Sequence, residues 1–579
     1  MNQKNGEINI FNNDYNNNNQ NEDMQKMCNN ERCEMKLSLR KKKLNEIILD
    51  KRKSEIKKME NENFNYSKLI FLNDSITNLI SKIEIKSKEE QQIIDLLSMI
   101  SNILEQKHKN YKEQIISNIY NFTGEDLVNA NLLEKLSNLA QIYFNSPKVI
   151  LYICRILLFS CLIIKADVPN NDDNLLFDEN ENFNNSGYFI SSDKYIDIYN
   201  KILQIYLDKN LDITNNMIIF IGSIADDQET NQKSMFLSGT FKYILDSVNI
   251  KNDSKSLLNK KIFCLSKFSN SLIYENNLKL SLKIQEIYIE IFLNQEKFEL
   301  FRDINENEYN DCNFFFNFMK LIENTACCTE NIYVENLIKS TILEFLMDNS
   351  FNKYPNIIQT ILCILIDITS VDSALGKRLI NIGVVKYLKN IINDKTFPSE
   401  LRRSSFISIN NFVYEEDLWK MVLFDQKVIE MINTLLKDSD VKSSILIEIF
   451  YGLNQMLYYY KKDKAEDKLN NLLEQYSFIQ LICKAMKQII TKRENDKMMN
   501  LCIEQFCSFI IYLLTNYNDN NLIEKVTTKF QNSGGEEILD FILHIYINID
   551  YENITYEDKN IINNNLTNIN TIKDTIKDL

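Results

Sequence analysis

Apolar residues recur along most of this chain at the spacing of one helix face. In the segment QQIIDLLSMISNIL, for example, Ile93, Leu97, Ile100 and Leu104 follow one another at intervals of three or four residues. A helix with one apolar side needs neighbours that cover that side. The pattern therefore predicts a series of amphipathic helices that pack against one another.

The pattern also divides the chain into segments. It predicts a helical array over residues 69–550, with a surface insertion near 167–187, where Asn and Asp dominate. Residues 1–34 are rich in Asn, Gln and acids and are expected to be disordered, since they have little apolar area to bury. A basic segment follows at 35–60, and 551–579 is interpreted as a C-terminal tail.

Similar motifs recur at a regular distance. Gly239 and Gly383 each lie 17 residues after the start of a related motif, GSIADD or IDITSVD, and Asn454 lies 44 residues after Asn410. Armadillo and HEAT repeats have periods of about 40–47 residues. The sequence therefore predicts an all-α fold, a right-handed superhelical solenoid of about ten armadillo repeats with a concave binding surface. The alternative is a generic helical scaffold without this period.

Composition narrows the class of protein. The 10 Gly and 4 Pro leave little material for sheet turns or phosphate-binding loops, and a net charge of -14 suits basic partners better than nucleic acid. The 12 Cys are scattered without metal-ligand spacing, which favours a reduced intracellular compartment. The longest apolar run, residues 149–164, includes Arg155 and is shorter than the roughly 20 residues of a spanning helix. We expect neither direct nucleic-acid binding nor membrane insertion.

Catalysis is not expected. His108 and His544 are the only histidines, and neither lies in a pattern typical of a catalytic triad or a zinc site. Glycine-rich nucleotide-binding motifs are also missing from the sequence. The sequence therefore predicts a binding protein with no catalytic residues, no metal and no cofactor.

The basic segment LSLRKKKLNEIILDKRK carries the first resemblance to a known family. It is similar to the importin-beta-binding element of importin-alpha, in which an LRK triplet and a spaced basic residue precede a second basic cluster. Arg40, Lys41 and Lys43 match the first part, and Lys51 and Arg52 match the second. The resemblance implies importin-beta as a partner of these five residues.

A second resemblance lies in the repeats. Importin-alpha carries a Trp and, one helical turn later, an Asn on the third helix of most repeats, and these side chains bind a basic nuclear localisation signal. Phe406 with Asn410 and Phe450 with Asn454 match this pattern with Phe in place of Trp. The resemblance implies that they bind the signal. The alternative interpretation is that both Phe rings are core residues.

Two earlier positions also resemble the family's signal-binding site. Asn270, in the sequence SNSL, matches the family's Asn. Asp227, the last residue of GSIADD, matches the acid that pairs with the principal lysine of the signal. The resemblance implies that both contribute to signal binding.

Taken over the chain, the resemblance implies a divergent nuclear import adaptor. Such a protein binds cargo that bears basic signals, links it to importin-beta, returns through a nuclear export receptor, and is found in cytoplasm and nucleus. The family's basic segment also folds back into the signal site, so autoinhibition is a further hypothesis. The alternative is an armadillo scaffold that has lost signal binding.

Overall fold

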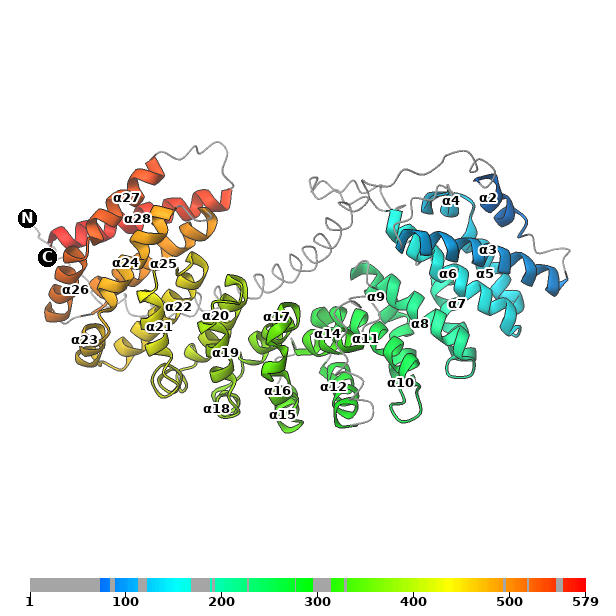
Figure 1. Ribbon diagram of the computed structural model, residues 1–579, viewed down its shortest axis with the longest axis horizontal. Helices are drawn as coiled ribbons and strands as arrows, with labels where there is room; N and C mark the ends of the chain where they lie inside the picture. Colours follow the sequence, from blue (N-terminus) through cyan, green and yellow to red (C-terminus); the bar gives the residue numbers. More distant parts are fainter. Residues whose placement is uncertain are drawn as a thin grey trace, which may run out of the picture. The chain divides into compact units, whose positions relative to one another are not determined.

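The computed structural model describes most of the chain from residue 73 onward (Figure 1). The described residues are 73–83, 89–112, 122–167, 188–189, 193–225, 229–275, 278–294, 314–326, 331–492, 496–517, 520–547 and 556–578. All regular secondary structure in these ranges is helical, which confirms the predicted all-α fold. Both predicted N-terminal segments lie outside the described residues, as does nearly all of the insertion predicted near 167–187.

The helices have the following bounds: α2 Asn73–Ser81, α3 Glu90–Lys112, α4 Gly124–Asn129, α5 Leu132–Tyr143, α6 Pro147–Asp167, α7 Asp193–Tyr206, α8 Leu211–Ala225, α9 Glu229–Leu237, α10 Thr240–Ser247, α11 Lys255–Glu275, α12 Leu278–Leu293, α14 Phe314–Ala326, α15 Asn331–Lys339, α16 Ile342–Leu346, η4 Asn349–Lys353, α17 Pro355–Ile368, α18 Ser373–Asn381, α19 Val384–Asn393, α20 Ser399–Val413, η5 Met421–Asp425, α21 Val428–Lys437, α22 Ser443–Lys462, α23 Glu466–Gln475, α24 Phe478–Lys492, α25 Asp496–Thr515, α26 Asn520–Asn532, α27 Gly535–Ile547 and α28 Tyr556–Asp578. Here η4 is a 3-10 helix and η5 a π-helix.

These helices belong to two compact units. The first comprises residues 1–138 and 162–184, and the second comprises residues 139–161 and 185–579. Within the first unit, Lys135 Nζ donates a hydrogen bond to the carbonyl of Ile80 at 2.9 Å. Gly124 lies so close to Ile164 that an added Cβ would be 2.7 Å from its side chain, so this glycine permits a close helix contact.

The second unit is a stack of helical repeats. In the repeat formed by α18, α19 and α20, two short helices precede a longer one, and Gly383 joins the short helices with a φ of +98°. Gly239 joins α9 to α10 in the same way, at +83°. These two glycines are the pair that the sequence repeat aligned, because a left-handed turn favours a residue without a Cβ.

The last helix of each repeat contacts the last helix of the next one. In chain order these are α8, α11, α14, α17, α20, α22, α25 and α28, and they form what we call the long-helix row (Figure 1). Ser399 begins α20 and Ser443 begins α22, a distance of 44 residues that agrees with the predicted period. Each repeat thus buries its apolar face against its neighbours, as in other solenoids.

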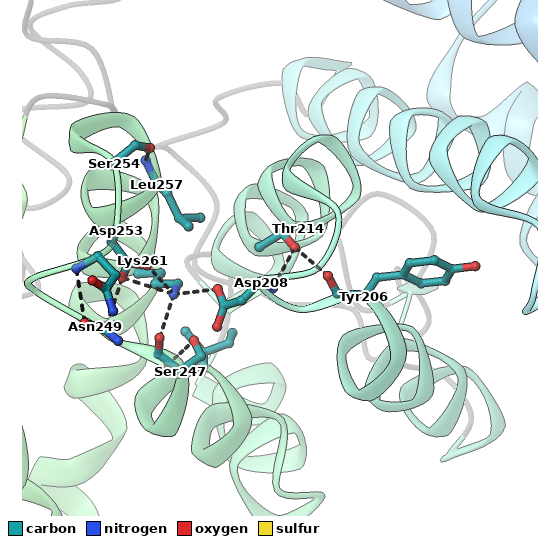
Figure 2. Close-up of polar contacts among 11 residues, drawn as sticks. Tyr206, Asp208, Thr214, Ser247, Asn249, Asp253, Ser254, Leu257 and Lys261 are labelled. Carbon is teal, nitrogen blue, oxygen red and sulfur yellow. Dashed lines mark hydrogen bonds and ion pairs between the residues drawn. The ribbon is translucent and has the colours of Figure 1, made fainter.

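A buried lysine joins two of these repeats (Figure 2). The side chain of Lys261, on α11, is fully buried, and its Nζ lies 2.8 Å from Asp208 Oδ1 and 3.1 Å from both carboxylate oxygens of Asp253. It also donates to the carbonyl of Ser247 at 2.6 Å. Burial of a cation is tolerated only with such pairing. The contacts therefore fix the turns after α7 and α10 against α11.

The prediction of a C-terminal tail was wrong. Residues 556–578 form the helix α28, which packs on α25 and α27. Asn565 Nδ2 donates to the carbonyl of Asn500 at 3.0 Å and to the hydroxyl of Tyr546 at 2.9 Å. Its polar composition suggested a tail, but Ile569 and Ile572 belong to an apolar stripe at helical spacing that is completely buried.

Two described helical stretches, Pro147–Ala166 and Met498–Thr515, are long and apolar enough to cross a membrane. In the structure 61% and 56% of these stretches are buried against other helices. The core helix of a repeat array has the same length and composition, so this feature is weak evidence for a membrane span.

Candidate functional site

One side of the long-helix row remains accessible. On α20 the partly or fully exposed residues are spaced by three or four positions, so they lie on one face of the helix, and the same holds for α22 and α25. We call this side the free face. Its accessible residues are Glu400, Arg403, Ser404 and Ile407 on α20, Ser444, Tyr451, Gln455 and Tyr458 on α22, and Leu501, Glu504, Ser508 and Tyr512 on α25.

Two asparagines join successive long helices in the same manner. Asn411 Nδ2, on α20, donates to the carbonyl of Ile366 at 2.9 Å and to Thr369 Oγ1 at 3.0 Å, both on or next to α17. Asn324, on α14, donates to the carbonyl of Ser266 and to Ser269 Oγ on α11, at 2.8 and 2.9 Å. In both cases the two acceptors are three residues apart. Asn324 on α14 is therefore equivalent to Asn411 on α20, and Ser266 on α11 is equivalent to Ile366 on α17.

The two phenylalanines predicted to bind a ligand lie in the interior. Phe406 is 1% exposed and Phe450 is 0% exposed. The centre of the Phe450 ring lies 6.0 Å from the ring centre of Phe506 and 6.1 Å from that of Phe509. These positions favour the core interpretation, because a ring without exposed surface offers nothing to a peptide outside. Whether the chain binds a localisation signal stays a prediction.

Asn410 and Asn454, which the sequence analysis paired with these phenylalanines, connect neighbouring helices. Asn410, 3% exposed, donates to the Glu448 carbonyl at 2.9 Å and to Glu448 Oε2 at 3.3 Å, so it joins α20 to α22. Gly452 makes room for it, because a Cβ there would lie 2.8 Å from Asn410 Oδ1. Asn454 is partly exposed; it donates to Gln505 Oε1 at 3.3 Å and joins α22 to α25, while its Oδ1 is buried and has no hydrogen-bond partner among the described residues.

The accessible residues Ile407 and Tyr451 lie one residue after these two rings. One helical turn after them come Asn411, which is buried, and Gln455, which is accessible. The sequence indicates which positions face outward. A large apolar residue directly follows both Asn411 and Gln455, and such residues mark the buried side of each helix. The sequence interpretation selected Phe406 and Phe450 because they are aromatic, and both lie on the buried side of their helices.

The other predicted site residues are not placed by the structure. Asn270 belongs to α11, but its side chain lies outside the described part, and Asp227 lies outside it altogether. The five basic residues expected to bind importin-beta are also outside the described residues: Arg40, Lys41, Lys43, Lys51 and Arg52.

Three carboxylates gather beyond the C-terminal ends of α17 and α20. Burial raises the pKa of Glu415, and the nearby carboxylates of Asp372 and Asp417 raise this pKa further. Asp372 accepts hydrogen bonds from Asn331 and from the backbone of Leu375, and Asp417 accepts one from Ser373. In the described part of the chain, none of the three carboxylates pairs with a lysine or arginine. We call Asp372, Glu415 and Asp417 the acidic cluster.

Aromatic side chains lie beside the acidic cluster. Tyr459 donates from its hydroxyl to the carbonyl of Tyr414, and its ring stacks on Trp419 at 5.4 Å with an interplanar angle of 12°. The charges of Glu415 and Glu416 help to raise the pKa of Tyr459 to about 12, after burial, which has the largest effect. These relations place the acidic cluster next to the end of α22, close to the free face.

The described residues include the side-chain types that commonly bind metals, which are His, Cys, Asp and Glu. They contain no group of three or more His, Cys, Asp or Glu side chains arranged to hold a metal ion. Burial raises the pKa of the thiols of Cys154, Cys264 and Cys507, which keeps these groups protonated and unreactive.

Comparison with known proteins supports the fold. No protein-family model matches the sequence, and no curated protein matches it. An engineered protein solved by the Northeast Structural Genomics Consortium has 12% identity and a TM-score of 0.52, over 86% of this chain and 99% of its own. A structure from work on the interaction between cadherin and beta-catenin has 11% identity and a TM-score of 0.51, over 86% of this chain and 83% of its own.

A designed armadillo repeat protein in complex with the peptide (KR)4 is similar over 47% of this chain and 97% of its own, at 11% identity. Its TM-score of 0.32 is too low to support an argument. The two longer matches are armadillo-repeat solenoids, and at these identities they show the fold alone. The predicted all-α armadillo solenoid is therefore confirmed.

Proposed function

We propose that this chain is a binding adaptor that takes an extended basic segment of a partner protein along the free face of α20, α22 and α25. The observation that carries the proposal is the acidic cluster, in which Asp372 and Asp417 repel the carboxylate of Glu415 and no lysine or arginine among the described residues pairs with any of the three. A lysine or arginine of the partner would relieve this repulsion. The C-terminal ends of α17 and α20 add partial negative charge at the same place.

The free face supplies the remaining contacts. Tyr451 and Tyr458 offer ring surfaces for the aliphatic stems and charged ends of basic side chains, and Tyr458 is 38% exposed. Gln455 can bind the backbone groups of an extended peptide. This combination of amide, ring and acid suits a basic peptide better than an acidic or apolar one.

In its finer form the proposal is a nuclear import adaptor. The basic segment at 35–60 would bind importin-beta, the cargo would carry a basic nuclear localisation signal, and a nuclear export receptor would return the adaptor. Such a protein would be found in cytoplasm and nucleus. Support comes from the resemblance of the basic segment and from its position before an armadillo array in a chain with a net charge of -14.

A scaffold that has lost signal binding is the second candidate. The specific observation in its favour is the burial of Phe406 and Phe450, which leaves Ile407 in place of an aromatic ring on the free face of α20. A free face with fewer exposed aromatic rings binds basic side chains less well. In this case the chain would still bind proteins, but through other surfaces.

Titration of a labelled bipartite basic peptide against the full chain tests the proposal. The variant with Glu415→Gln and Asp417→Asn should bind about tenfold more weakly, because two partly desolvated charge pairs are lost. Asp467→Asn, an exposed acid on α23, is the matched control and should leave affinity unchanged. Equal affinity of the double variant and the control would remove the acidic cluster from the proposal, and absence of binding at low salt would favour the scaffold.

A further inference from the structure

A further carboxylate borders the acidic cluster. Glu416 lies between Glu415 and Asp417 in the sequence, in the turn that follows α20. Burial has the largest effect in raising the pKa of Tyr459, on α22, and the charges of Glu415 and Glu416 raise this pKa further, so both acids lie near this tyrosine. Whereas no lysine or arginine among the described residues pairs with the acidic cluster, Lys462 Nζ donates a hydrogen bond to Glu416 Oε2. One carboxylate of this turn is thus already occupied by a cation of the chain.

The pair of Lys462 and Glu416 lies at the surface. The two side chains are 46% and 57% exposed, so water and salt screen their attraction. Exposed ion pairs of this kind add little to stability. The hydrogen bond to Glu416 is the main cause that raises the pKa of Lys462, so the ammonium group stays charged at neutral pH. The pair is therefore fully charged but can be exchanged at small cost.

Lys462 also adjoins the free face. It follows Tyr458 by four residues on α22, so the two side chains lie on one side of the helix, and they interact electrostatically. Tyr458 is one of the accessible residues of the free face and is 38% exposed. Lys462 thus lies next to Tyr458 on the free face and contacts Glu416 beside the acidic cluster. A basic segment that binds both surfaces would meet the repulsion of this lysine.

We propose that Glu416 is a further binding residue of this site, which Lys462 occupies in the chain without a partner and from which a basic side chain of the partner displaces it. The inference rests on the proposed function, because it concerns the same basic segment. The exchange replaces one exposed ion pair by another, so it costs little. The partner segment accordingly carries at least two basic side chains, one for the acidic cluster and one for Glu416. Lys462 lowers the affinity for such a segment because it competes for the same carboxylate.

Fluorescence anisotropy of a fluorescein-labelled bipartite basic peptide with the full chain tests this competition. Lys462→Gln should bind the peptide about threefold more tightly than the parent chain, because Glu416 is then available without displacement. Lys461→Gln is the matched control, since it removes the same charge from the neighbouring position, and Lys461 Nζ bonds to Asn516 Oδ1 at 2.9 Å rather than to an acid. In a Glu416→Gln background, Lys462→Gln should bind no more tightly than Lys461→Gln. Both lysines are exposed, and equal melting temperatures verify that the variants fold alike.

Two results would overturn the inference. Equal affinity of Lys462→Gln and Lys461→Gln would show that Lys462 does not compete with the peptide. An equal gain with and without Glu416 would assign the effect to the general loss of positive charge. If the peptide still binds more weakly to the variant with Glu415→Gln and Asp417→Asn, either result removes this inference alone and leaves the proposed function in place. Absence of peptide binding to the parent chain at low salt would remove both.

Discussion

Asn411 bridges two repeats through a single amide group. Its bonds to the carbonyl of Ile366 and to Thr369 Oγ1 lie in a site where the Asn411 side chain is 7% exposed, so water does not replace them readily. We expect Asn411→Ala to lower the free energy of unfolding by about 1–3 kcal/mol. Denaturant titration followed by circular dichroism measures the change, with the exposed Asn390→Ala on α19 as the control. A loss no larger than that of the control would show that the bridge adds no stability.

Glu415 gives the acidic cluster a pH dependence. Its pKa is raised in the folded chain, so the folded state holds a proton more readily than the unfolded state, and stability falls as pH rises from 4.5 through the raised pKa. At neutral pH the ionised carboxylate is therefore a cost, and Glu415→Gln should raise the melting temperature at pH 7 but not below pH 4.5. Differential scanning calorimetry at both pH values checks this, and a lower melting temperature at pH 7 would contradict it.

The sequence interpretation selected α20 and α22, two helices of the proposed binding surface, but the structure does not test its site residues as signal ligands. It paired Asn410 and Asn454 with Phe406 and Phe450, and these two rings are buried. Periodicity alone separates the two sides of a helix poorly when both sides carry apolar residues, as in α20. The acidic cluster could not be predicted, because Asp372 and Glu415 come from successive repeats and meet only when these stack.

At the scale of elements, the repeat period was the most reliable signal. Gly239 and Gly383 lie in turns with a positive φ, a conformation that favours glycine. Because this requirement is local, the sequence alone reveals where these turns occur. The contact of Lys261 with Asp208 and Asp253 depends on side chains up to 53 residues apart. Such pairings follow from the stacking of repeats, and no local pattern marks them.

At the scale of the whole molecule, the packing of α28 indicates that this helix caps the helical array. A solenoid needs a terminal element that covers the last apolar face and presents polar residues outward. In α28 the side chain of Ile569 is buried, whereas Asn563, Asn564 and Thr567 are exposed, so this helix has the character of a cap. Asn565 also satisfies the carbonyl of Asn500 on α25.

A chain that stops after Ile547 should therefore lose more than one helix. Removing α28 exposes the apolar side of α25 to water, and we expect a lower melting temperature, self-association at high concentration, and faster amide hydrogen exchange that is greatest in α25 and α27. The double variant Asn563→Ala and Asn564→Ala, which alters only the exposed face of α28, is the control and should leave exchange unchanged. Exchange in α25 equal to that of the full chain would show that the array ends at α27 and that α28 is dispensable.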